Sequence, residues 1–576
     1  MIKLRIMNLP TAYNRFMTRF SHLVTLGLAL LGLAACGAAP KPAPPQSANS
    51  AVPRERLSRM VDRYWDEHES LGAAISPQVM ADSLAVERRY LAEILAVPRA
   101  TLDTNSRLTY DIFRRQRELA VEGFTYPTEL LAVDPFGGMP QQLAHMAADT
   151  GQAPLTTARD YENWLRRIDD YGLWTQQAIS NMREGIRRGY TSPRAVIERT
   201  LPVLERLGED TSANVFYVPL RSMPETIKDP ERTRLGANFS TAVKDKLLPA
   251  YRALHDFLQR EYLPRARVSV ALSALPLGSS WYAYRVRVNT STLLTPNEIH
   301  SIGLTEVERI RARMQSLSAG TAPVVGAVLS AYTDLKAQTL AAMPTLFSAV
   351  PPSDFEIRAV DPFSQVATRL SYQPAGPGGT SAVLYVDISS TSAGPATVLT
   401  GSFLREAIPG RHYQSALQQA RTDLPRFRRF GTEPAFVEGW GLYAASLGEE
   451  LGLYPVDEAK TGALLDQLRC AAALVVDTGL HAKGWTRTQA LDYFRTQLGV
   501  DAASADLLVD RFVALPGDAL ACKMGELKIQ ALRSRAQQAL GTRFDIREFH
   551  SEILNDGAMP LDILEAKTTL WIESRR

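Results

Sequence analysis

The sequence predicts a mainly α-helical protein that also contains a small β-sheet. Over residues 54–263, apolar residues recur three and four positions apart, which is the spacing of one face of a helix. Residues 295–298 read Thr-Pro-Asn-Glu, a typical helix start. Two short segments, 280–289 and 382–388, instead have the character of strands. Together these observations predict a helical body with the sheet between its two halves.

The first helical region begins near Arg54 and ends near Leu263. Its apolar stripes are expected in the core, and they include Leu57, Met60, Val61, Tyr64, Tyr161, Trp164, Leu165 and Ile168. Pro193, Pro202 and Pro219 interrupt the helical pattern. No self-similarity of fixed period appears, so a solenoid is not expected.

Strands are expected in the middle of the chain. Residues 280–289 (SWYAYRVRVN) alternate in character, and residues 382–388 (AVLYVDI) form a short apolar run behind the turn-rich segment 374–379. Helix returns at residues 295–298, where Thr is the cap, Pro occupies the first turn and Glu closes a capping box. Long helices follow, and the last third of the chain holds most of the suggestive clusters.

The composition is that of a folded globular protein. The chain has 576 residues, of which 45% are hydrophobic and 22% are charged. Its formal net charge is +3, but four basic residues and no acidic residue precede position 36, so the remainder is nearly neutral. A basic nucleic-acid-binding protein is therefore not expected.

The N-terminal segment, residues 1–35, has the features of a signal peptide. A short apolar run at 23–33 follows Arg15 and Arg19, and it is too short to span a bilayer as a helix. It ends in Leu-Ala-Ala-Cys, which resembles a bacterial lipobox with Cys36 as the lipidated residue. The alternative is an ordinary secretory peptide, cleaved near Ala35. Met17 is a second candidate start, because the basic, apolar and lipobox order is complete from there.

Residues 36–53 are rich in Pro, Ala and Ser and are expected to be an extended tether, so that residues 54–576 form the body. Gly37 stands where an Asp would retain a lipoprotein in the inner membrane, so we expect anchoring in the cell envelope at the periplasmic face of the outer membrane. Only Cys470 and Cys522 remain in the body, and whether they pair stays open.

Two segments of the last third carry a family resemblance. Residues 403–414 read FLREAIPGRHYQ, and residues 436–454 read FVEGWGLYAASLGEELGLY. They resemble the bacterial family named domain of unknown function 885, whose hallmark is HExxPGHH followed by EGWxxYxE. The resemblance continues over residues 293–303, 469–485, 511–525 and 544–561, and so spans nearly the whole mature chain.

Members of that family are similar to helical zinc metallopeptidases, in which one helix carries His-Glu and a following helix supplies a Glu ligand. The resemblance therefore implies a large helical metallopeptidase-like body. A catalytic zinc ion needs about three nitrogen or oxygen ligands and one open position for water, and an unligated Glu takes the proton of that water.

This chain departs from the family pattern where the ligands are expected. Arg405 replaces the leading His, Arg411 replaces the first His of the HH pair, and Ala445 replaces the last Glu. A guanidinium group has no lone pair to give to a metal, and a methyl group cannot be a ligand. The resemblance thus implies a broken zinc site, and no cofactor is expected.

Other parts of the pattern are retained. Glu406 corresponds to the catalytic base, and His412, Glu438 and Tyr443 also match the family. Cys522 replaces a Tyr of the family's PGxAxxYxxG segment, so a phenol that can hydrogen-bond an oxyanion gives way to a thiol, which is a poor donor.

Two interpretations of Arg405 and Arg411 remain open. The two side chains would hold a carboxylate, either Glu406 or Glu438 of the chain itself or the terminal carboxylate of a peptide. Alternatively they would only neutralise a buried acid left by the loss of a metal.

Further candidates come from the same resemblance. His412 would join His481 and His550 in an alternative metal or acid–base site, or each would be an ordinary buried histidine. Asp477, His481 and Arg511 would line a substrate cleft, or Asp477 and Arg511 would form an internal ion pair between two helices.

The leading hypothesis is a lipid-anchored periplasmic protein that has kept a peptide-binding-like cleft and lost zinc-dependent catalysis. Its partners would be the membrane, through Cys36, and a peptide or an envelope protein. The enzyme alternative is a metal-dependent peptidase or amidase with a shifted zinc site, in which Glu406, His412 and His481 act together with Glu438 or Glu449. A third hypothesis is an envelope scaffold without a ligand.

The chain has no GxSxG, Walker or GxGxxG motif, so a serine hydrolase or a nucleotide-dependent enzyme is not expected.

Overall fold

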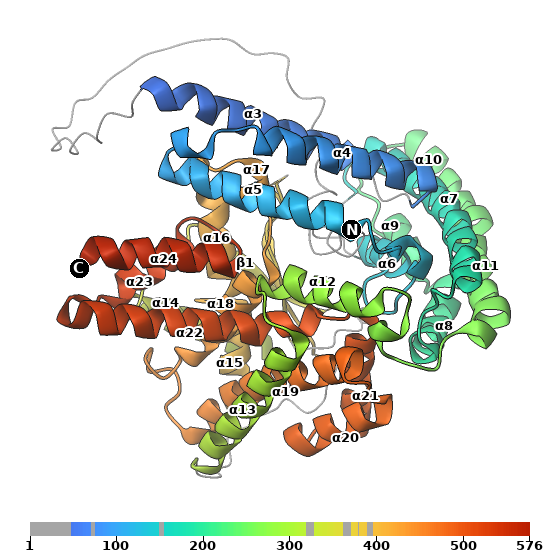
Figure 1. Ribbon diagram of the computed structural model, residues 1–576. Helices are drawn as coiled ribbons and strands as arrows, with labels where there is room; N and C mark the ends of the chain where they lie inside the picture. The colour runs from blue at the N-terminus through green and yellow to red at the C-terminus, as the bar shows by residue number, and fades with distance from the viewer. Residues whose placement is uncertain are drawn as a thin grey trace.

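The computed structural model describes residues 48–70, 75–148, 155–317, 328–360, 370–377, 379–388 and 396–576. The predicted signal peptide, lipobox and most of the tether lie outside these residues. Figure 1 shows the N-terminal helices across the top of the molecule, a helical flank formed by α7 to α11, and the C-terminal helices opposite that flank.

The first part of the chain is helical, as predicted for residues 54–263. Three helices cross the top of Figure 1, namely α3 (Ala48–Ser70), α4 (Pro77–Leu95) and α5 (Thr104–Gly123). The flank then consists of α6 (Met139–Ala148), α7 (Ala158–Arg188), α8 (Arg194–Gly208), α9 (Val218–Arg221), α10 (Glu231–Ala242) and α11 (Leu248–Phe257). Two π-helical turns, Val243–Leu247 and Leu258–Tyr262, extend α11 at its two ends.

Three helices and the sheet occupy the middle of the chain. The helices are α12 (Gly278–Thr290), α13 (Pro296–Gln315) and α14 (Val328–Ala342). The strands are β1 (Phe355–Ala359), β2 (Leu370–Gln373) and β3 (Ala382–Val386). They lie in the order β1-β3-β2, with β3 parallel to β1 and antiparallel to β2.

The last third is again helical. Its helices are α15 (Ala396–Glu406), α16 (Arg411–Ala420), α17 (Arg426–Arg429), α18 (Pro434–Ser446), α19 (Asp457–Ala482), α20 (Arg487–Leu498), α21 (Ala502–Ala514), α22 (Ala521–Leu540), α23 (Ile546–Leu554) and α24 (Leu561–Arg575). The mainly α fold with a small sheet is therefore confirmed.

Helix starts are specified locally by side-chain caps. The predicted capping box at Thr295 is present, since its hydroxyl accepts from Glu298 N–H and the Glu298 carboxylate accepts from Thr295 N–H. Equivalent boxes begin α7 at Thr157 and α20 at Thr486.

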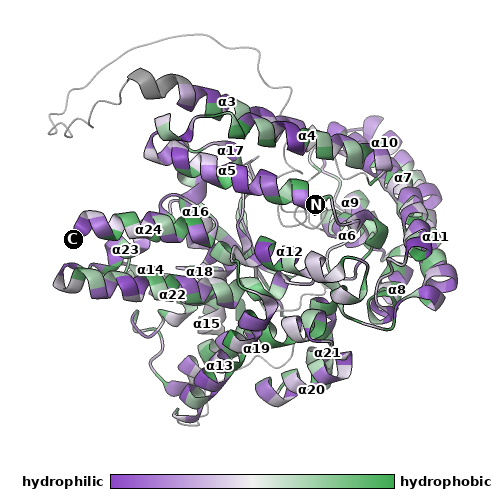
Figure 2. Ribbon diagram, viewed as in Figure 1, coloured by the Kyte–Doolittle hydropathy of each residue, from purple (hydrophilic) through white to green (hydrophobic). Residues whose placement is uncertain are grey.

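The core consists of two large hydrophobic clusters and smaller ones beside them. One cluster joins the N-terminal helices, the sheet and the C-terminal helices, and the other lies inside the flank around Trp164 and Tyr251. Figure 2 shows hydrophobic and hydrophilic residues on the same helices, which is the pattern of amphipathic helices that turn one face inward. None of the described helices is both long enough and apolar enough to cross a membrane.

One predicted element is wrong. Residues 280–289, expected as a strand, lie within helix α12. The apolar and aromatic residues of α12, Trp281, Tyr282, Tyr284, Val286 and Val288, are buried because the helix is packed on several sides. The second predicted strand is confirmed as β3.

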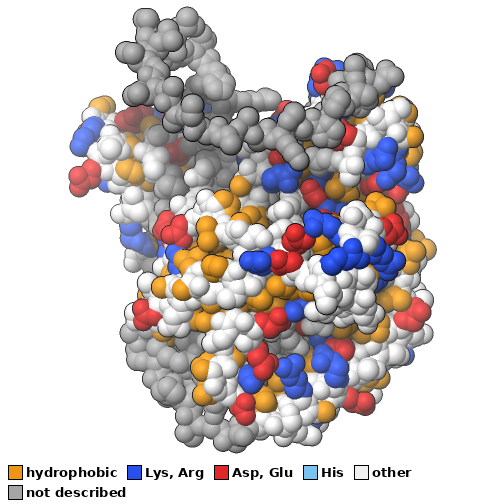
Figure 3. Space-filling view, turned by 90° about the vertical axis from the view of Figure 1, so that its left-hand side faces the viewer, with side chains coloured by type: hydrophobic (Ala, Val, Ile, Leu, Met, Phe, Trp, Pro, Cys, Tyr) orange, Lys and Arg blue, Asp and Glu red, His pale blue; other side chains and the backbone are white. Residues whose placement is uncertain are grey.

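Figure 3 shows the face of the molecule that is on the left in Figure 1. Acidic and basic side chains are interspersed on it, together with scattered apolar side chains.

Candidate functional site

The site begins where α15 ends and α16 starts. Arg405 and Glu406 lie in the last turn of α15, and Arg411 is the first residue of α16. Between the two helices, a Cβ atom on Gly410 would lie 2.0 Å from the Arg405 carbonyl oxygen and 2.3 Å from that of Leu404, so only glycine fits this turn. The Trp440 indole N–H fixes the turn from α18, by donating to the Pro409 carbonyl oxygen at 2.9 Å.

The close crossing of helices α18 and α22 positions Glu438 on the other side of the site. Gly439 of α18 and Gly525 of α22 face each other, and a Cβ atom on Gly439 would lie 2.4 Å from the Gly525 Cα atom. This contact brings α18, with Glu438, against α22. α15 packs on both α18 and α19.

Four charged side chains meet between α15, α16 and α18, and we call them the charge cluster: Arg405, Glu406, Arg411 and Glu438. Arg405 Nε lies 3.5 Å from Glu406 Oε1, and its Nη2 lies 3.3 Å from Glu438 Oε2. Arg411 Nη1 lies 3.0 Å from Glu406 Oε2, and its Nη2 lies 3.5 Å from Glu438 Oε1. Each guanidinium group thus bridges both carboxylates, and the four groups form a closed ring with no net charge.

Burial and charge act against each other in the charge cluster. Burial alone would lower the pKa of Arg405, but the charges of Glu406 and Glu438 raise the pKa above its ordinary value. Burial would likewise raise the pKa of Glu438, but the charges of Arg411 and Arg405 hold it below its ordinary value. The charged forms of Arg405 and Glu438 are therefore favoured, because each has opposite charges beside it.

One side of the charge cluster is accessible. The exposed fractions of the Arg411 and Glu438 side chains are 25% and 21%, against 10% for Arg405. The charge of Arg511, in α21, also lowers the pKa of Glu438, after the larger effects of Arg411 and Arg405. The Arg511 side chain is 40% exposed and makes one ion pair, at 3.3 Å, with Asp518. A ligand that approaches from solvent would therefore meet Arg411, Glu438 and Arg511.

Cys470 and Cys522 form a disulfide beside the charge cluster, which answers the question that the sequence left open. The bond joins α19 to α22 and packs against Leu442 of α18. Arg405 Nη1 lies 3.9 Å from Cys470 Sγ. The disulfide thus covers the inner side of Arg405, and Cys522 has no free thiol to offer a ligand.

His412 points away from the charge cluster, toward the sheet. Its Nε2 atom donates to the Ser353 carbonyl oxygen at 3.0 Å, which leaves Nδ1 to accept from the Tyr372 hydroxyl at 3.1 Å. Burial lowers the pKa of His412 to about 4, so the ring is neutral at pH 7.

The His550 ring, elsewhere in the core, makes the same two kinds of hydrogen bond as the His412 ring. Its Nδ1 atom donates to the Leu346 carbonyl oxygen at 2.9 Å, and its Nε2 atom accepts from the Tyr443 hydroxyl at 2.8 Å. Burial lowers the pKa of His550 to about 4. Arg533 donates to the Tyr443 oxygen at 3.2 Å, so both hydrogen-bonding functions of Tyr443 are used inside the protein.

Asp477 and His481 lie one turn apart on α19 and are fully buried. The Asp477 carboxylate accepts from the Tyr282 hydroxyl and from Gly517 N–H, while His481 accepts from Leu272 N–H and donates to the Phe512 carbonyl oxygen. The expectation that these two side chains line an open cleft is therefore wrong. The predicted ion pair between Asp477 and Arg511 is also wrong, since the ion pair that Arg511 makes is with Asp518.

The predicted site residues therefore do not form a single site. Four of them make up the charge cluster, and the three histidines lie apart from it and from one another, each in its own set of hydrogen bonds. The structure brings Arg405, Glu406, Arg411 and Glu438 together, with Cys522 and Arg511 at the edge. It separates His412, His481 and His550, and in the described ranges no three His, Cys, Asp or Glu side chains are arranged to hold a metal ion. The residues present at the charge cluster do not fit a zinc ion, because guanidinium groups occupy the space between the two carboxylates.

Two residues near the charge cluster were missed by the sequence analysis. Asp466 and Arg469 of α19 form an ion pair at 3.3 Å, and the Asp466 charge raises the pKa of Arg405. Burial lowers the pKa of Arg469. Their spacing of three residues on a predicted helix was the available signal.

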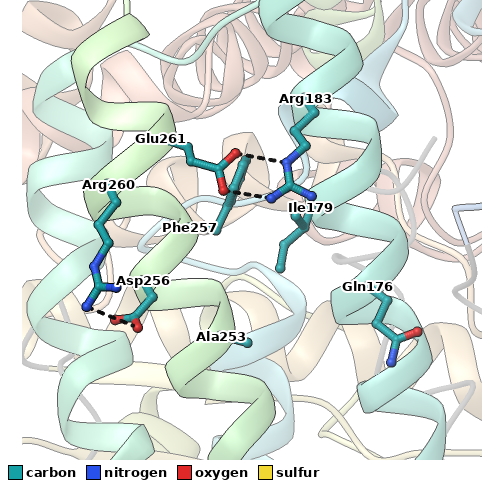
Figure 4. Close-up of a pocket in the computed structure, with 8 residues that line it drawn as sticks. All are labelled: Gln176, Ile179, Arg183, Ala253, Asp256, Phe257, Arg260 and Glu261. Atoms are coloured by element: carbon teal, nitrogen blue, oxygen red, sulfur yellow. Dashed lines mark hydrogen bonds and ion pairs between the residues drawn. The ribbon is translucent and has the colours of Figure 1, made fainter.

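A separate cavity of about 430 Å³ lies between α7 and α11 (Figure 4). Ile179, Ala253 and Phe257 supply apolar surface, and the ion pairs Arg183–Glu261 and Arg260–Asp256 flank it. None of the sequence-predicted site residues lines it, so it is distinct from the charge cluster.

Comparison with known proteins gives a family match and structural neighbours. Residues 61–567 match the family described as "Bacterial protein of unknown function (DUF885)". A crystal structure described as "the putative lipoprotein from Colwellia psychrerythraea" is 24% identical, with a TM-score of 0.79, and the match covers 91% of this chain and 100% of that chain. A second structure, "a putative lipoprotein of unknown function from Shewanella oneidensis", is 15% identical with a TM-score of 0.66, and covers 90% of this chain and 99% of that chain. No curated protein matches.

Proposed function

The chain belongs to the DUF885 family of bacterial proteins, and from this we propose that it is a lipid-anchored envelope protein whose metallopeptidase-like site is non-catalytic and binds a peptide carboxylate. The anchor would be Cys36, at the periplasmic face of the outer membrane. The lipobox-like sequence and the two structural neighbours described as lipoproteins support the anchor.

The charge cluster carries the non-catalytic part of the proposal. Arg405 and Arg411 occupy two positions at which the family pattern has histidines, and each bridges Glu406 and Glu438. Two guanidinium groups supply the same charge as one divalent metal ion but cannot bind or polarise a water molecule as a metal does. Glu406, the expected base, is also engaged by Arg411.

The accessible edge of the charge cluster supports binding. Arg411 and Arg511 are the exposed cations, and guanidinium groups bind carboxylates with two parallel hydrogen bonds. Among the described residues, Asp518 is the one ion-pair partner of Arg511, at 3.3 Å, and it is itself 28% exposed, so a ligand carboxylate can replace it without leaving a fully buried charge. A peptide with a free C-terminal carboxylate has the matching chemistry.

Zinc content tests the loss of the metal site. The chain from Gly37 onward, purified and dialysed against a weak chelator, is expected to hold almost no zinc by elemental mass spectrometry. The variant Arg405→His/Arg411→His/Ala445→Glu is expected to hold close to one zinc ion per chain, because it restores two imidazoles and a carboxylate as possible ligands.

The matched control is Arg405→Gln/Arg411→Gln, which removes the guanidinium groups without adding ligands and should stay free of zinc. Circular dichroism establishes that each variant is folded. Near-stoichiometric zinc in the natural sequence would overturn the proposal and favour a shifted metal site with peptidase or amidase activity.

Peptide binding is tested with two pools of mixed-sequence tetrapeptides, one with free C-terminal carboxylates and one amidated. Equilibrium dialysis followed by mass spectrometry should show about tenfold weaker binding of the amidated pool, because a charge-assisted hydrogen bond contributes about 1.5–3 kcal/mol. Arg511→Ala should abolish the difference between the pools, and Arg511→Lys should retain part of it. Equal binding of both pools, or no binding of either, would contradict the ligand class and favour a scaffold.

A further inference from the structure

The N-terminal end of the body carries an excess of positive charge, and we call this end the basic tip. It consists of two segments, residues 53–60 at the start of α3 and residues 95–107 between the end of α4 and the first turn of α5. The two segments hold five arginines and two acids, which gives a charge of +3: Arg54, Arg56, Arg59, Arg99 and Arg107 against Glu55 and Asp103. Because the chain from Cys36 onward is nearly neutral, its other residues carry a net negative charge.

The two segments of the basic tip lie side by side because α3 and α4 are antiparallel. Arg63 of α3 pairs with Glu93 of α4 at 2.6 Å, and further along α3 Glu67 pairs with the earlier Arg89. Moving back along α3 therefore means moving forward along α4, so the start of α3 reaches the chain that follows α4. The contacts between α3 and the 3-10 turn Arg99–Thr101 agree with this arrangement.

The basic tip faces solvent. The side chains of Arg59 and Glu55 are 72% and 67% exposed, and that of Arg99 is 50% exposed. Arg56 is exposed, and among the described residues it forms no ion pair. Leu95, at the end of α4, is 53% exposed. The basic tip thus combines guanidinium groups with a large apolar side chain, which suits the headgroup region of a bilayer.

The acids that follow on α3 are neutralised within the body. Arg426 of α17 forms ion pairs with Asp62 at 3.4 Å and with Asp66 at 2.9 Å, and Arg89 of α4 pairs with Glu67. An anionic surface at the basic tip would therefore meet little repulsion from the rest of α3.

The proposed lipid anchor holds this end of the body close to a bilayer. Cys36 and Ala48 are twelve residues apart, and a fully extended chain of that length reaches about 40 Å. The basic tip begins five residues after Ala48. A patch on so short a tether has an effective concentration on the order of millimolar at the membrane, so a weak attraction is enough to dock it.

We propose that the basic tip docks on the anionic phospholipid surface of the membrane that holds the lipid anchor. Its arginines would bind headgroup phosphates through charge-assisted hydrogen bonds, and Leu95 would lie at the boundary of the acyl chains. The docking surface rests on the proposed anchor at Cys36. In Figure 1, α3 begins at the upper left, whereas α21, which carries Arg511, lies toward the lower right. The docked body therefore holds the accessible edge of the charge cluster away from the bilayer.

Vesicle co-sedimentation tests the docking surface without the lipid anchor. The chain from Gly37 onward lacks the anchoring cysteine, so its binding reports the protein surface alone. It is expected to bind vesicles of equal parts phosphatidylglycerol and phosphatidylcholine at least about tenfold more strongly than pure phosphatidylcholine vesicles, because each Arg near an anionic surface contributes roughly fivefold. Raising the salt concentration from about 0.05 M to about 0.5 M should remove the difference, since salt screens the attraction.

Charge reversal locates the interaction on the surface. The variant Arg54→Glu/Arg56→Glu/Arg59→Glu should bind the anionic vesicles at least about tenfold more weakly. The matched control changes the net charge by the same amount, and it should weaken binding by less than about threefold because its sites lie on the helical flank. It reverses three exposed arginines of α7, α10 and α11 and the turn that extends α11: Arg187→Glu/Arg234→Glu/Arg260→Glu. Circular dichroism establishes that both variants are folded.

A second variant keeps the test decisive if the triple reversal does not fold. Leu95→Glu places an acid in the other segment of the basic tip and leaves α3 unchanged, and it should also weaken binding to the anionic vesicles. Equal binding of the natural sequence to both kinds of vesicle, equal weakening by the tip and flank reversals, or unchanged binding of Leu95→Glu would each overturn the docking surface.

Lipidation is measured separately, from the intact mass of the protein extracted from bacterial membranes. An unmodified Cys36 would overturn the anchor in the proposed function, whereas the absence of vesicle binding would overturn the docking surface alone. The two failures are therefore distinguishable.

Discussion

Replacing Glu438 by alanine is expected to lower the free energy of unfolding by about 3–5 kcal/mol. Glu438 carries half of the negative charge of the charge cluster, and both Arg405 and Arg411 lie within ion-pair distance of it. Without it, two guanidinium groups share Glu406 alone, and one positive charge remains buried without compensation. An uncompensated buried charge is among the costliest single changes in a folded protein.

The measurement is urea unfolding at pH 7, followed by circular dichroism. Glu118→Ala is the matched control, because Glu118 forms an exposed ion pair with Arg114 within α5 and should cost less than about 1 kcal/mol. Glu438→Gln should be nearly as damaging as Glu438→Ala, since the amide keeps the shape but not the charge. A loss below 1 kcal/mol for both Glu438 variants would mean that the charge cluster is solvated rather than buried.

Removal of the disulfide should have an effect of similar size. Cys470 and Cys522 are 52 residues apart in the sequence. In the chain-entropy account, a loop of that length corresponds to about 4 kcal/mol of stabilisation. Reduced protein and the variant Cys470→Ala/Cys522→Ala are both expected to unfold at markedly lower denaturant concentration, with a similar loss of stability.

Thiol titration supplies the control for this experiment. The chain from Gly37 onward contains only these two cysteines, so the denatured, unreduced protein should show no free thiol and the reduced protein should show two. Single Cys→Ala variants should unfold like the double variant. If reduction leaves the transition unchanged, the bond does not constrain α19 and α22 in the way the structure indicates.

Much of the fold could be predicted because it depends on local patterns. The apolar spacing of residues 54–263, the capping box at Thr295 and the short apolar run of β3 each specify their element with few neighbours. α12 was mistaken for a strand because its aromatic and β-branched residues alternate with other residues over 280–289. Packing on several sides removes the one-sided stripe by which a helix is recognised, so tertiary contacts overrode the local preference.

The sequence predicts which residues form the charge cluster, but it does not predict where the neighbouring histidine side chains point. The motif spacing placed Arg405, Glu406, Arg411 and Glu438 in neighbouring segments, and the structure brings them into contact. The same motifs could not show that His412 turns toward β2 or that His481 binds the end of α21. Side-chain direction depends on the turn at Gly410 and on helices distant in sequence, and these are properties of the whole fold.

The closed ring of charges also constrains how the chain can change over generations. Each member of the charge cluster faces two groups of opposite charge, so a single substitution that removes the charge of Arg405, Glu406, Arg411 or Glu438 leaves the other three unbalanced. Under the proposed function, a change to a metal-binding set of residues at these positions would pass through less stable intermediates or need simultaneous substitutions. Within that proposal, the stability of the charge cluster would oppose a stepwise change to metal binding.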